Sequence, residues 1–289
     1  MLCVADFANG WLQGNSASDA RFHLPCPIKI CPMKRIMVNG VGLELLEITQ
    51  PPAQPHRAPL VFLHEGLGSV AMWRDWPALL CAATGRAGWV YSRRGYGQSD
   101  SVPDVRDAGR LPADYLQQQA WSVLPALLTA LGIAAPVLVG HSNGGSIALL
   151  HASRFEVAAV VVMAPHVMVE DVSIQSIKQA RTTFETGDLR ERLARFHANV
   201  DCAFWQWNDV WLSDGFRAFD IRPDCQRIKS PILAIQGIDD IYGSMRQIDE
   251  IHPLGPITRH KLAECGHCAH RDQADLTLRL IADFLKTTD

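Results

Sequence analysis

Ser142 is the residue of this sequence with the clearest capacity for chemistry, and it lies in the pentapeptide GHSNG at residues 140–144. This G-x-S-x-G spacing is typical of a sharp turn that exposes a nucleophilic serine between a strand and a helix. Residues 136–139 (PVLV) predict a buried strand before the turn, and residues 144–151 predict a helix after it. The pentapeptide alone fits a tight turn with a solvent-exposed serine equally well, but this placement favours a nucleophile.

A serine hydroxyl is unreactive at its own pKa, so it needs a base, and the base needs a group that orients it. His267 follows the last expected strand, at residues 259–262, and Asp240 follows the expected strand at residues 231–235. Side chains at the carboxyl ends of neighbouring parallel strands gather at one edge of a sheet. The sequence therefore predicts Ser142 as nucleophile, His267 as base and Asp240 as orienting acid.

Two neighbouring residues offer alternatives that spacing does not separate. Asp239 could take the place of Asp240, the other aspartate then capping the next helix or facing solvent. His270 is the corresponding alternative to His267, and a purely structural histidine is a further one.

Acyl transfer also requires hydrogen-bond donors directed at the oxyanion, and losing one such donor typically lowers the rate about 10²–10³-fold. The backbone amide of Asn143, directly after the nucleophile, is one candidate. Another is the amide of Leu67 or of Gly66, in the glycine-rich loop after the expected strand at residues 59–63. A glycine-rich turn can also bind phosphate, but this loop lacks the spacing of either nucleotide-binding fingerprint.

The expected strands and helices that would position these residues indicate an α/β domain. Residues 34–38 and 41–48 flank Asn39-Gly40 and predict a hairpin. The later strands are apolar throughout, which is typical of a parallel sheet covered by helices on both faces. We expect this core to comprise residues 33–166 and 229–289, after an irregular N-terminal extension at residues 1–32.

Residues 167–228 contain no convincing buried strand, and we expect a helical cap over the carboxyl ends of the strands. Its aromatic side chains predict a site for an apolar or aromatic acyl group, although the same rings could simply attach the cap to the core. The candidate substrate-binding residues are His64 in the glycine-rich loop and His197, Phe204, Trp205, Trp207 and Trp211 in the cap.

Composition excludes several classes of function. The formal net charge of −3 argues against a nucleic-acid partner, and no apolar run is long enough to span a membrane. The N-terminus lacks the pattern of a secretory signal, so we expect a cytoplasmic protein acting on a small-molecule substrate. The oligomeric state is left open, including a homo-oligomer.

No cofactor or metal is expected. The motif CGHC at residues 265–268 also occurs in thioredoxin-type redox proteins, but there it lies near the start of the domain, not near its end. Zinc would need two further ligands at suitable spacing, and none is evident.

The segments LHEGLGSVAMW, YSRRGYGQSD, GHSNGG, IQGIDDIYG and CGHCAHRDQ occur in this order and resemble the α/β-hydrolase superfamily over residues 33–285. The resemblance implies an eight-stranded, mostly parallel sheet flanked by helices, with the helical cap inserted after the sixth strand. It also implies that the acid is Asp240, three residues after a glycine, and that the base is His267 in the last Gly-His pair.

Two departures from the family pattern affect the expectation. Where the family usually has His-Gly, this chain has His64-Glu65-Gly66, which leaves the register of the oxyanion loop open. We expect Glu65 to turn away from the oxyanion, toward Arg93 or Arg94. Ser142 argues against haloalkane dehalogenases and epoxide hydrolases, which use an aspartate at this position.

The central expectation is a carboxylesterase for small or medium substrates with an apolar or aromatic acyl group. Hydrolysis of a thioester, a lactone, an amide or a vinylogous C–C bond on the same fold is the alternative. A non-catalytic small-molecule receptor is a further alternative. Ser142→Ala separates the two, because a receptor would keep its response to the ligand whereas an enzyme would lose turnover.

Overall fold

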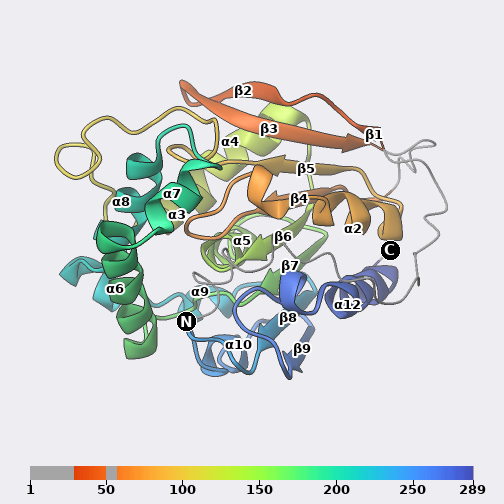
Figure 1. Ribbon diagram of the computed structural model, residues 1–289. Coiled ribbons are helices and arrows are strands. Elements are labelled where there is room, and N and C mark those ends of the chain that lie inside the picture. Colours follow the sequence, from red (N-terminus) through yellow and green to blue (C-terminus); the bar gives the residue numbers. More distant parts are fainter. Residues whose placement is uncertain (1–28, 50–56, 289) are drawn as a thin grey trace, which may run out of the picture.

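The computed structural model describes residues 29–49 and 57–288, which form one twisted sheet with helices around it (Figure 1). The sheet has nine strands in the order β1-β3-β5-β4-β6-β7-β8-β9, with β2 paired to β3. The strands that form the parallel part are β4 (Leu60–Leu63), β5 (Gly88–Tyr91), β6 (Val137–His141), β7 (Ala159–Met163), β8 (Ile232–Gly237) and β9 (Ile257–Leu262). The α/β architecture and the mostly parallel sheet agree with the prediction from the sequence.

The antiparallel edge begins with the predicted hairpin, formed by β2 (Lys34–Val38) and β3 (Val41–Thr49). Asn39 and Gly40 have φ values of 51° and 77°. Two consecutive positive φ angles are those of a type I′ turn, whose twist matches that of the flanking strands. β3 then pairs antiparallel with β5 and so joins the hairpin to the parallel part of the sheet.

The strands β4, β6, β7 and β8 are buried on both faces, which explains why their sequences do not alternate between apolar and polar residues. Successive residues of β4 and β7 belong in turn to two different hydrophobic clusters, one on each face of the sheet. One face is covered by α2 (Trp76–Thr84) and α12 (Ala274–Lys286), and the other by α4 (Leu124–Leu131) and α5 (Asn143–Ala152). The remaining short helices of the core are η1 (Ala71–Trp73), α3 (Tyr115–Gln118), η2 (Gln119–Val123), α10 (Arg246–Asp249) and α11 (Ala269–Asp272).

The sheet has one strand more than the eight that the sequence predicted. The additional strand is β1 (Lys29–Ile30), which pairs with the end of β3 through Lys29 and Thr49. Its two residues are both exposed, so they carry no alternation of burial from which a strand could be predicted. It lies within the expected N-terminal extension, whose residues 1–28 are outside the described residues.

Between β7 and β8 the chain forms five helices, α6 (Asp171–Thr186), α7 (Leu189–Ala194), α8 (Val200–Trp211), η3 (Asp214–Ala218) and α9 (Arg222–Cys225). We call them the inserted helices. α6, α7 and α8 gather on one side of the molecule, opposite α2 and α12 (Figure 1). In the described ranges, no helix combines the length and apolarity needed to cross a membrane.

Candidate active site

Ser142 occupies a strained turn between β6 and α5. Its φ and ψ are 53° and −120°, a conformation that residues other than glycine rarely adopt. A Cβ atom on Gly140 would lie 2.3 Å from the carbonyl oxygen of Gly144, and one on Gly144 would lie 2.0 Å from that of Leu63. Both glycines are therefore required by the close approach of the chain, and the turn holds the serine at the carboxyl end of the sheet.

His267 and Asp240 form an ion-pair contact beside this turn. The Nδ1 atom of His267 lies 2.9 Å from each carboxylate oxygen of Asp240, whose side chain is only 1% exposed. Burial by itself would raise the pKa of Asp240, but the attraction of His267 and the amide of Tyr242 outweigh it and lower the pKa. Asp239 is exposed to solvent, so the structure brings Asp240 to the histidine.

The predicted site residues from three parts of the chain line one pocket. Ser142, Asn143 and His267 share it with Gly66 and Leu67 of the glycine-rich loop. The expected nucleophile, base and amide donors are thus brought together, and Asp240 lies directly behind the base. His270 does not join them: its ring packs against Trp73 and Trp76.

His64 was expected to bind substrate, but it is not among the residues that line the pocket. Its Nε2 atom accepts a hydrogen bond from the amide of Arg93, so its Nδ1 atom is the one that donates, to the carbonyl of Glu65. The guanidinium of Arg93 binds the carbonyls of His64 and Glu65. Burial lowers the pKa of His64 well below its usual value. His64 is therefore neutral and fastens the glycine-rich loop.

His197, which lies between α7 and α8, also holds the glycine-rich loop in place. Its Nδ1 atom accepts from the amide of Gly97, and its Nε2 atom donates to the carbonyl of Leu67 at 3.0 Å. Burial lowers its pKa to about 4. His197 too lies outside the pocket lining, and both histidines hold carbonyl groups of the glycine-rich loop.

The four aromatic residues predicted for substrate binding divide into two pairs. Trp207 and Trp211 are one turn apart on α8 and both line the pocket. Phe204 stacks on Phe184 with ring centroids 3.7 Å apart, and Trp205 packs under the guanidinium of Arg106. Because Trp205 is two residues from Trp207, it lies on a different face of the helix.

Several pocket residues were not predicted from the sequence. Ile177, Leu189 and Leu193 of the inserted helices line the pocket with Trp207 and Trp211, and only the amphipathic spacing of α6 and α7 could have indicated them. Arg271 also lines the pocket, and its place four residues after His267 in the sequence is the signal that could have found it.

The carboxylate of Glu65 lies beside His141 and Arg271, not beside Arg93 or Arg94 as expected. One carboxylate oxygen lies 3.5 Å from Nδ1 of His141, and the other lies 3.9 Å from the guanidinium of Arg271. Burial would raise the pKa of Glu65, but these cationic groups lower it well below its usual value. Arg93 is occupied with the backbone of the loop, which explains the difference.

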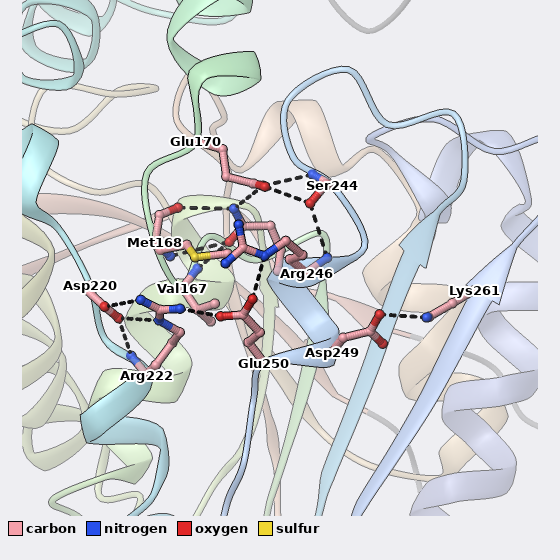
Figure 2. Close-up of polar contacts among 11 residues, drawn as sticks. Val167, Met168, Glu170, Asp220, Arg222, Ser244, Arg246, Asp249, Glu250 and Lys261 are labelled. Atoms are coloured by element: carbon pink, nitrogen blue, oxygen red, sulfur yellow. Dashed lines mark hydrogen bonds and ion pairs between the residues drawn. The ribbon is translucent and has the colours of Figure 1, made fainter.

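The loop that follows Asp240 is fastened by the first inserted helix. Within α6, Ser173 and Ser176 donate hydrogen bonds to the carbonyls of Tyr242 and Ile241, at 2.5 and 2.6 Å. Ahead of α6, the carboxylate of Glu170 accepts from the amide and hydroxyl of Ser244 (Figure 2). The inserted helices therefore support the segment that carries the acid.

Both ends of the segment between β7 and β8 are tied to α10 or to Glu250, the residue directly after it. The buried side chain of Gln247 accepts from the amide of Val167 at 2.7 Å and donates to the carboxylate of Glu170 at 2.6 Å. At the other end, Arg222 binds both Asp220 and Glu250 (Figure 2). The chain thus leaves the core and returns to it over the same short helix.

Comparison with known proteins agrees with this architecture. A model of the alpha/beta hydrolase family matches residues 60–280. The 2-hydroxy-6-oxo-6-phenylhexa-2,4-dienoate hydrolase of Comamonas testosteroni is 26% identical over 190 residues, which cover 55% of this chain and 66% of that protein.

Solved structures share the fold at low sequence identity. The enol-lactonase from Burkholderia xenovorans LB400 superposes with a TM-score of 0.66 at 20% identity, covering 88% of this chain and all (100%) of that one. The meta-cleavage product hydrolase from Pseudomonas fluorescens IP01 gives 0.65 at 19% identity, covering 89% and 98%. The family match extends over most of the chain, from β4 into α12. The chain therefore belongs to the alpha/beta hydrolase family and is a hydrolase.

Proposed function

We propose that this protein is a serine hydrolase that cleaves an ester-type bond of a small or medium substrate with an apolar or aromatic acyl group. The observation that carries the proposal is the buried pair of His267 and Asp240 at the pocket that contains the strained Ser142. A strained backbone that presents a hydroxyl beside such a pair is the arrangement that nucleophilic catalysis requires.

In the proposed mechanism His267 takes the proton of the Ser142 hydroxyl, and the serine oxygen attacks the substrate carbonyl. Asp240 holds Nδ1–H of the ring, so Nε2 is the atom that accepts the proton, and the carboxylate stabilises the imidazolium that forms. His267 then returns the proton to the leaving alcohol, and an acyl-enzyme remains. A water molecule, activated by the same histidine, releases the acid and restores the serine.

The charge on the carbonyl oxygen would be stabilised by the backbone amide of Asn143 together with that of Leu67 or Gly66. His64 and His197 support this assignment because they fix the carbonyls of Glu65 and Leu67 by hydrogen bonds. A preorganised loop need not rearrange as charge develops, which is the source of its catalytic effect.

The inserted helices would act as the cap that selects the acyl group. Ile177, Leu189, Leu193, Trp207 and Trp211 give the pocket an apolar side opposite the polar residues of the core. Trp207 also packs on Gly66, where a Cβ atom would meet its indole nitrogen at 2.3 Å. The cap and the oxyanion loop are therefore in direct contact, as expected if binding of the acyl group and catalysis are coupled.

Covalent labelling followed by turnover tests this proposal. A fluorophosphonate should modify Ser142, as located by mass spectrometry, and 4-nitrophenyl esters of graded acyl length should be hydrolysed. His267→Ala should abolish labelling. Asp240→Asn should lower kcat by roughly 10³–10⁴-fold, because the ring loses its orienting partner, whereas the exposed Asp239→Asn should have little effect. An unlabelled Ser142 with no hydrolysis of any ester would disprove the proposal.

Hydrolysis of a C–C bond is a second candidate, favoured by the similarity to the 2-hydroxy-6-oxo-6-phenylhexa-2,4-dienoate hydrolase. The same serine, histidine and aspartate would serve, and the apolar side of the pocket would receive the phenyl group. Turnover of that dienoate at a higher kcat/KM than any ester of the panel would select this candidate over the esterase. A receptor would instead keep its ligand in the Ser142→Ala variant without turning it over.

A further inference from the structure

His166 lines the pocket but has no part in the mechanism proposed above. It lies just beyond the carboxyl end of β7, in the segment that leads to α6, and its side chain is only 3% exposed. Its ring packs against that of Trp211 with centroids 4.8 Å apart, and the ring of His267 is 5.8 Å away. His166 thus adjoins both the proposed base and an aromatic side chain of the inserted helices.

The ring nitrogens of His166 are not used by the fold. Nδ1 is enclosed by protein and has no hydrogen-bond partner among the described residues. Nε2 has no partner there either, but it is not enclosed, so it is the atom that a molecule in the pocket can reach. The other histidines around the site each bind a backbone carbonyl or a carboxylate, namely His64, His141, His197 and His267.

His166 is uncharged at neutral pH. Burial and the proximity of His267 lower its pKa to about 3, although the carboxylate of Asp240 acts in the opposite direction. A neutral imidazole has one nitrogen that donates a hydrogen bond and one that accepts. His166 therefore offers a bound molecule a hydrogen-bonding group without a charge.

The backbone of His166 is fixed by the core. The Oγ atom of Ser146, in α5, accepts from the amide of His166 at 3.1 Å and donates to its carbonyl at 2.6 Å. Together with the packing against Trp211, these bonds hold the ring in place before anything binds. A group that is already held in place loses little conformational entropy when it forms a hydrogen bond, so a ligand that pairs with Nε2 gains affinity.

We propose that the acyl group of the substrate carries a hydroxyl group, which forms a hydrogen bond with Nε2 of His166 beside Trp211. An apolar group at this place would displace water from Nε2 and leave a buried polar atom unpaired, which is how a site discriminates strongly against an analogue that lacks the hydrogen-bonding group. A hydroxyl both donates and accepts, so it pairs with Nε2 in either tautomer of the ring. This inference rests on the proposed hydrolase function and narrows the acyl group to a hydroxyacyl group.

Pairs of esters that exchange a hydroxyl for a methyl group test the proposal. The 4-nitrophenyl esters of 2-hydroxybutyric, 3-hydroxybutyric and 3-hydroxy-3-phenylpropionic acid are compared with those of 2-methylbutyric, 3-methylbutyric and 3-phenylbutyric acid. Dividing each ratio of kcat/KM by the ratio of the rates in dilute hydroxide removes the electronic effect of the hydroxyl. The wild-type protein should favour the hydroxyl member of at least one pair by about tenfold or more. A ratio near one for every pair would overturn the proposal.

Three variants assign the preference to His166. His166→Phe keeps an aromatic ring against Trp211 but has no nitrogen, and it should reduce the hydroxyl-to-methyl ratio to near one. His166→Gln again supplies a donor and an acceptor and should recover part of the preference. His270→Phe is the matched control, because His270 is also buried and has no partner for Nδ1 in the described part of the chain, but it lies outside the lining. It should leave the ratio unchanged, whereas a preference that survives in His166→Phe would overturn the proposal.

A binding measurement separates this inference from the proposed function. Calorimetry of the Ser142→Ala variant with the ethyl esters of the same six acids reports binding without turnover. Binding of a hydroxy ester about tenfold or more tighter than its methyl counterpart, lost when His166→Phe is added, supports the hydrogen bond even if no ester is hydrolysed. Equal affinities within every pair would overturn the inference, whereas absence of hydrolysis alone would overturn only the proposed function.

Discussion

His141 is the residue whose role differs most from what its place in the sequence suggests. It directly precedes the nucleophile and lines the pocket, and its ring lies 2.8 Å from the carbonyl of His267 and faces Glu65. A buried imidazolium is costly unless paired, and the interactions of His141 with Cys268 and Glu65 are what offset this cost. The ring connects the turn that carries Ser142 with the loop that carries the base, and it acts as a positioning residue.

The stability of the wild-type protein relative to His141→Gln should therefore depend on pH. The pKa of His141 is raised to about 10 by folding from its usual 6.5, so its contribution is fully present below pH 6.5 and is lost as the pH rises toward 10. Urea unfolding at pH 6 and pH 9.5 should show the difference between the two proteins shrinking by about 1.5–3 kcal/mol.

His151→Gln is the matched control for that experiment. His151 is also buried in the core and binds the carbonyl of Ala120, but burial lowers its pKa. A lowered pKa means that the ring does not gain charge on folding, so its contribution should not shrink as the pH rises from 6 to 9.5. A pH-independent difference for His141→Gln would contradict the assignment of a charged ring.

For single residues, the sequence predicted those that directly follow a recognisable strand. It missed those whose role depends on contacts with distant parts of the chain. Ser142, Asp240 and His267 each follow a recognisable strand, so their convergence could be predicted. His64 and His197 were expected to bind substrate, but neither lines the pocket. Their function in the fold depends on Arg93 and Gly97, contacts that no local pattern reveals.

The helix α10 has only four residues, but together with the next residue, Glu250, it holds both ends of the segment between β7 and β8 (Figure 2). Gln247 is fully buried, and its amide satisfies backbone groups of Val167 and Met168 as well as the carboxylate of Glu170. Removing the amide would leave these groups without a partner away from water, where each costs about 1–3 kcal/mol.

Gln247→Leu should accordingly destabilise the protein by about 2–4 kcal/mol, as measured by urea unfolding. Hydrogen exchange of the amides of residues 167 and 168 should accelerate more than that of the central strands. Arg246→Ala on the same helix removes only an exposed ion pair with Glu250 and should leave the unfolding midpoint nearly unchanged. Equal effects of the two substitutions would show that Gln247 does not anchor the segment.

Element types were predicted well because the pattern of apolar residues has a different period in buried strands and in amphipathic helices. The hairpin at Asn39-Gly40 and the six parallel strands follow from such patterns. β1 could not be predicted, since a two-residue strand is defined only by its partner β3. The polar network at α10 likewise joins residues about 80 positions apart, such as Val167 and Gln247.

In the whole molecule, the pocket is formed by two parts of the chain, the α/β core and the inserted helices. The residues proposed for bond cleavage come from the ends of the sheet strands, whereas the inserted helices supply much of the apolar lining. Substitutions in the lining should therefore change which acyl group is accepted without changing the chemistry. Leu193 of α7 is suited to this test because it is buried and lines the pocket.

Leu193→Ala should shift the preference of the enzyme toward larger acyl groups, because it opens space for about three carbon atoms beside the pocket. Each methylene accommodated in an apolar pocket is worth roughly tenfold or more in kcat/KM, so the ratio of octanoyl to butyryl ester hydrolysis should rise at least about tenfold. Leu131→Ala, at the end of α4 and outside the lining, serves as the control. An unchanged ratio for Leu193→Ala would place the acyl group elsewhere.

The two ends of the inserted segment lie side by side. The amide of Ile221 donates to the carbonyl of Val167 at 2.8 Å, and Met168 and Asp220 form a β-bridge. A segment whose ends meet can be lengthened, shortened or exchanged without altering the distance that the rest of the chain must span. We therefore expect that a segment from another hydrolase could be grafted between these two positions while β7 and β8 keep their pairing, and that the graft would bring its own acyl-group preference if the inserted helices select the acyl group as proposed.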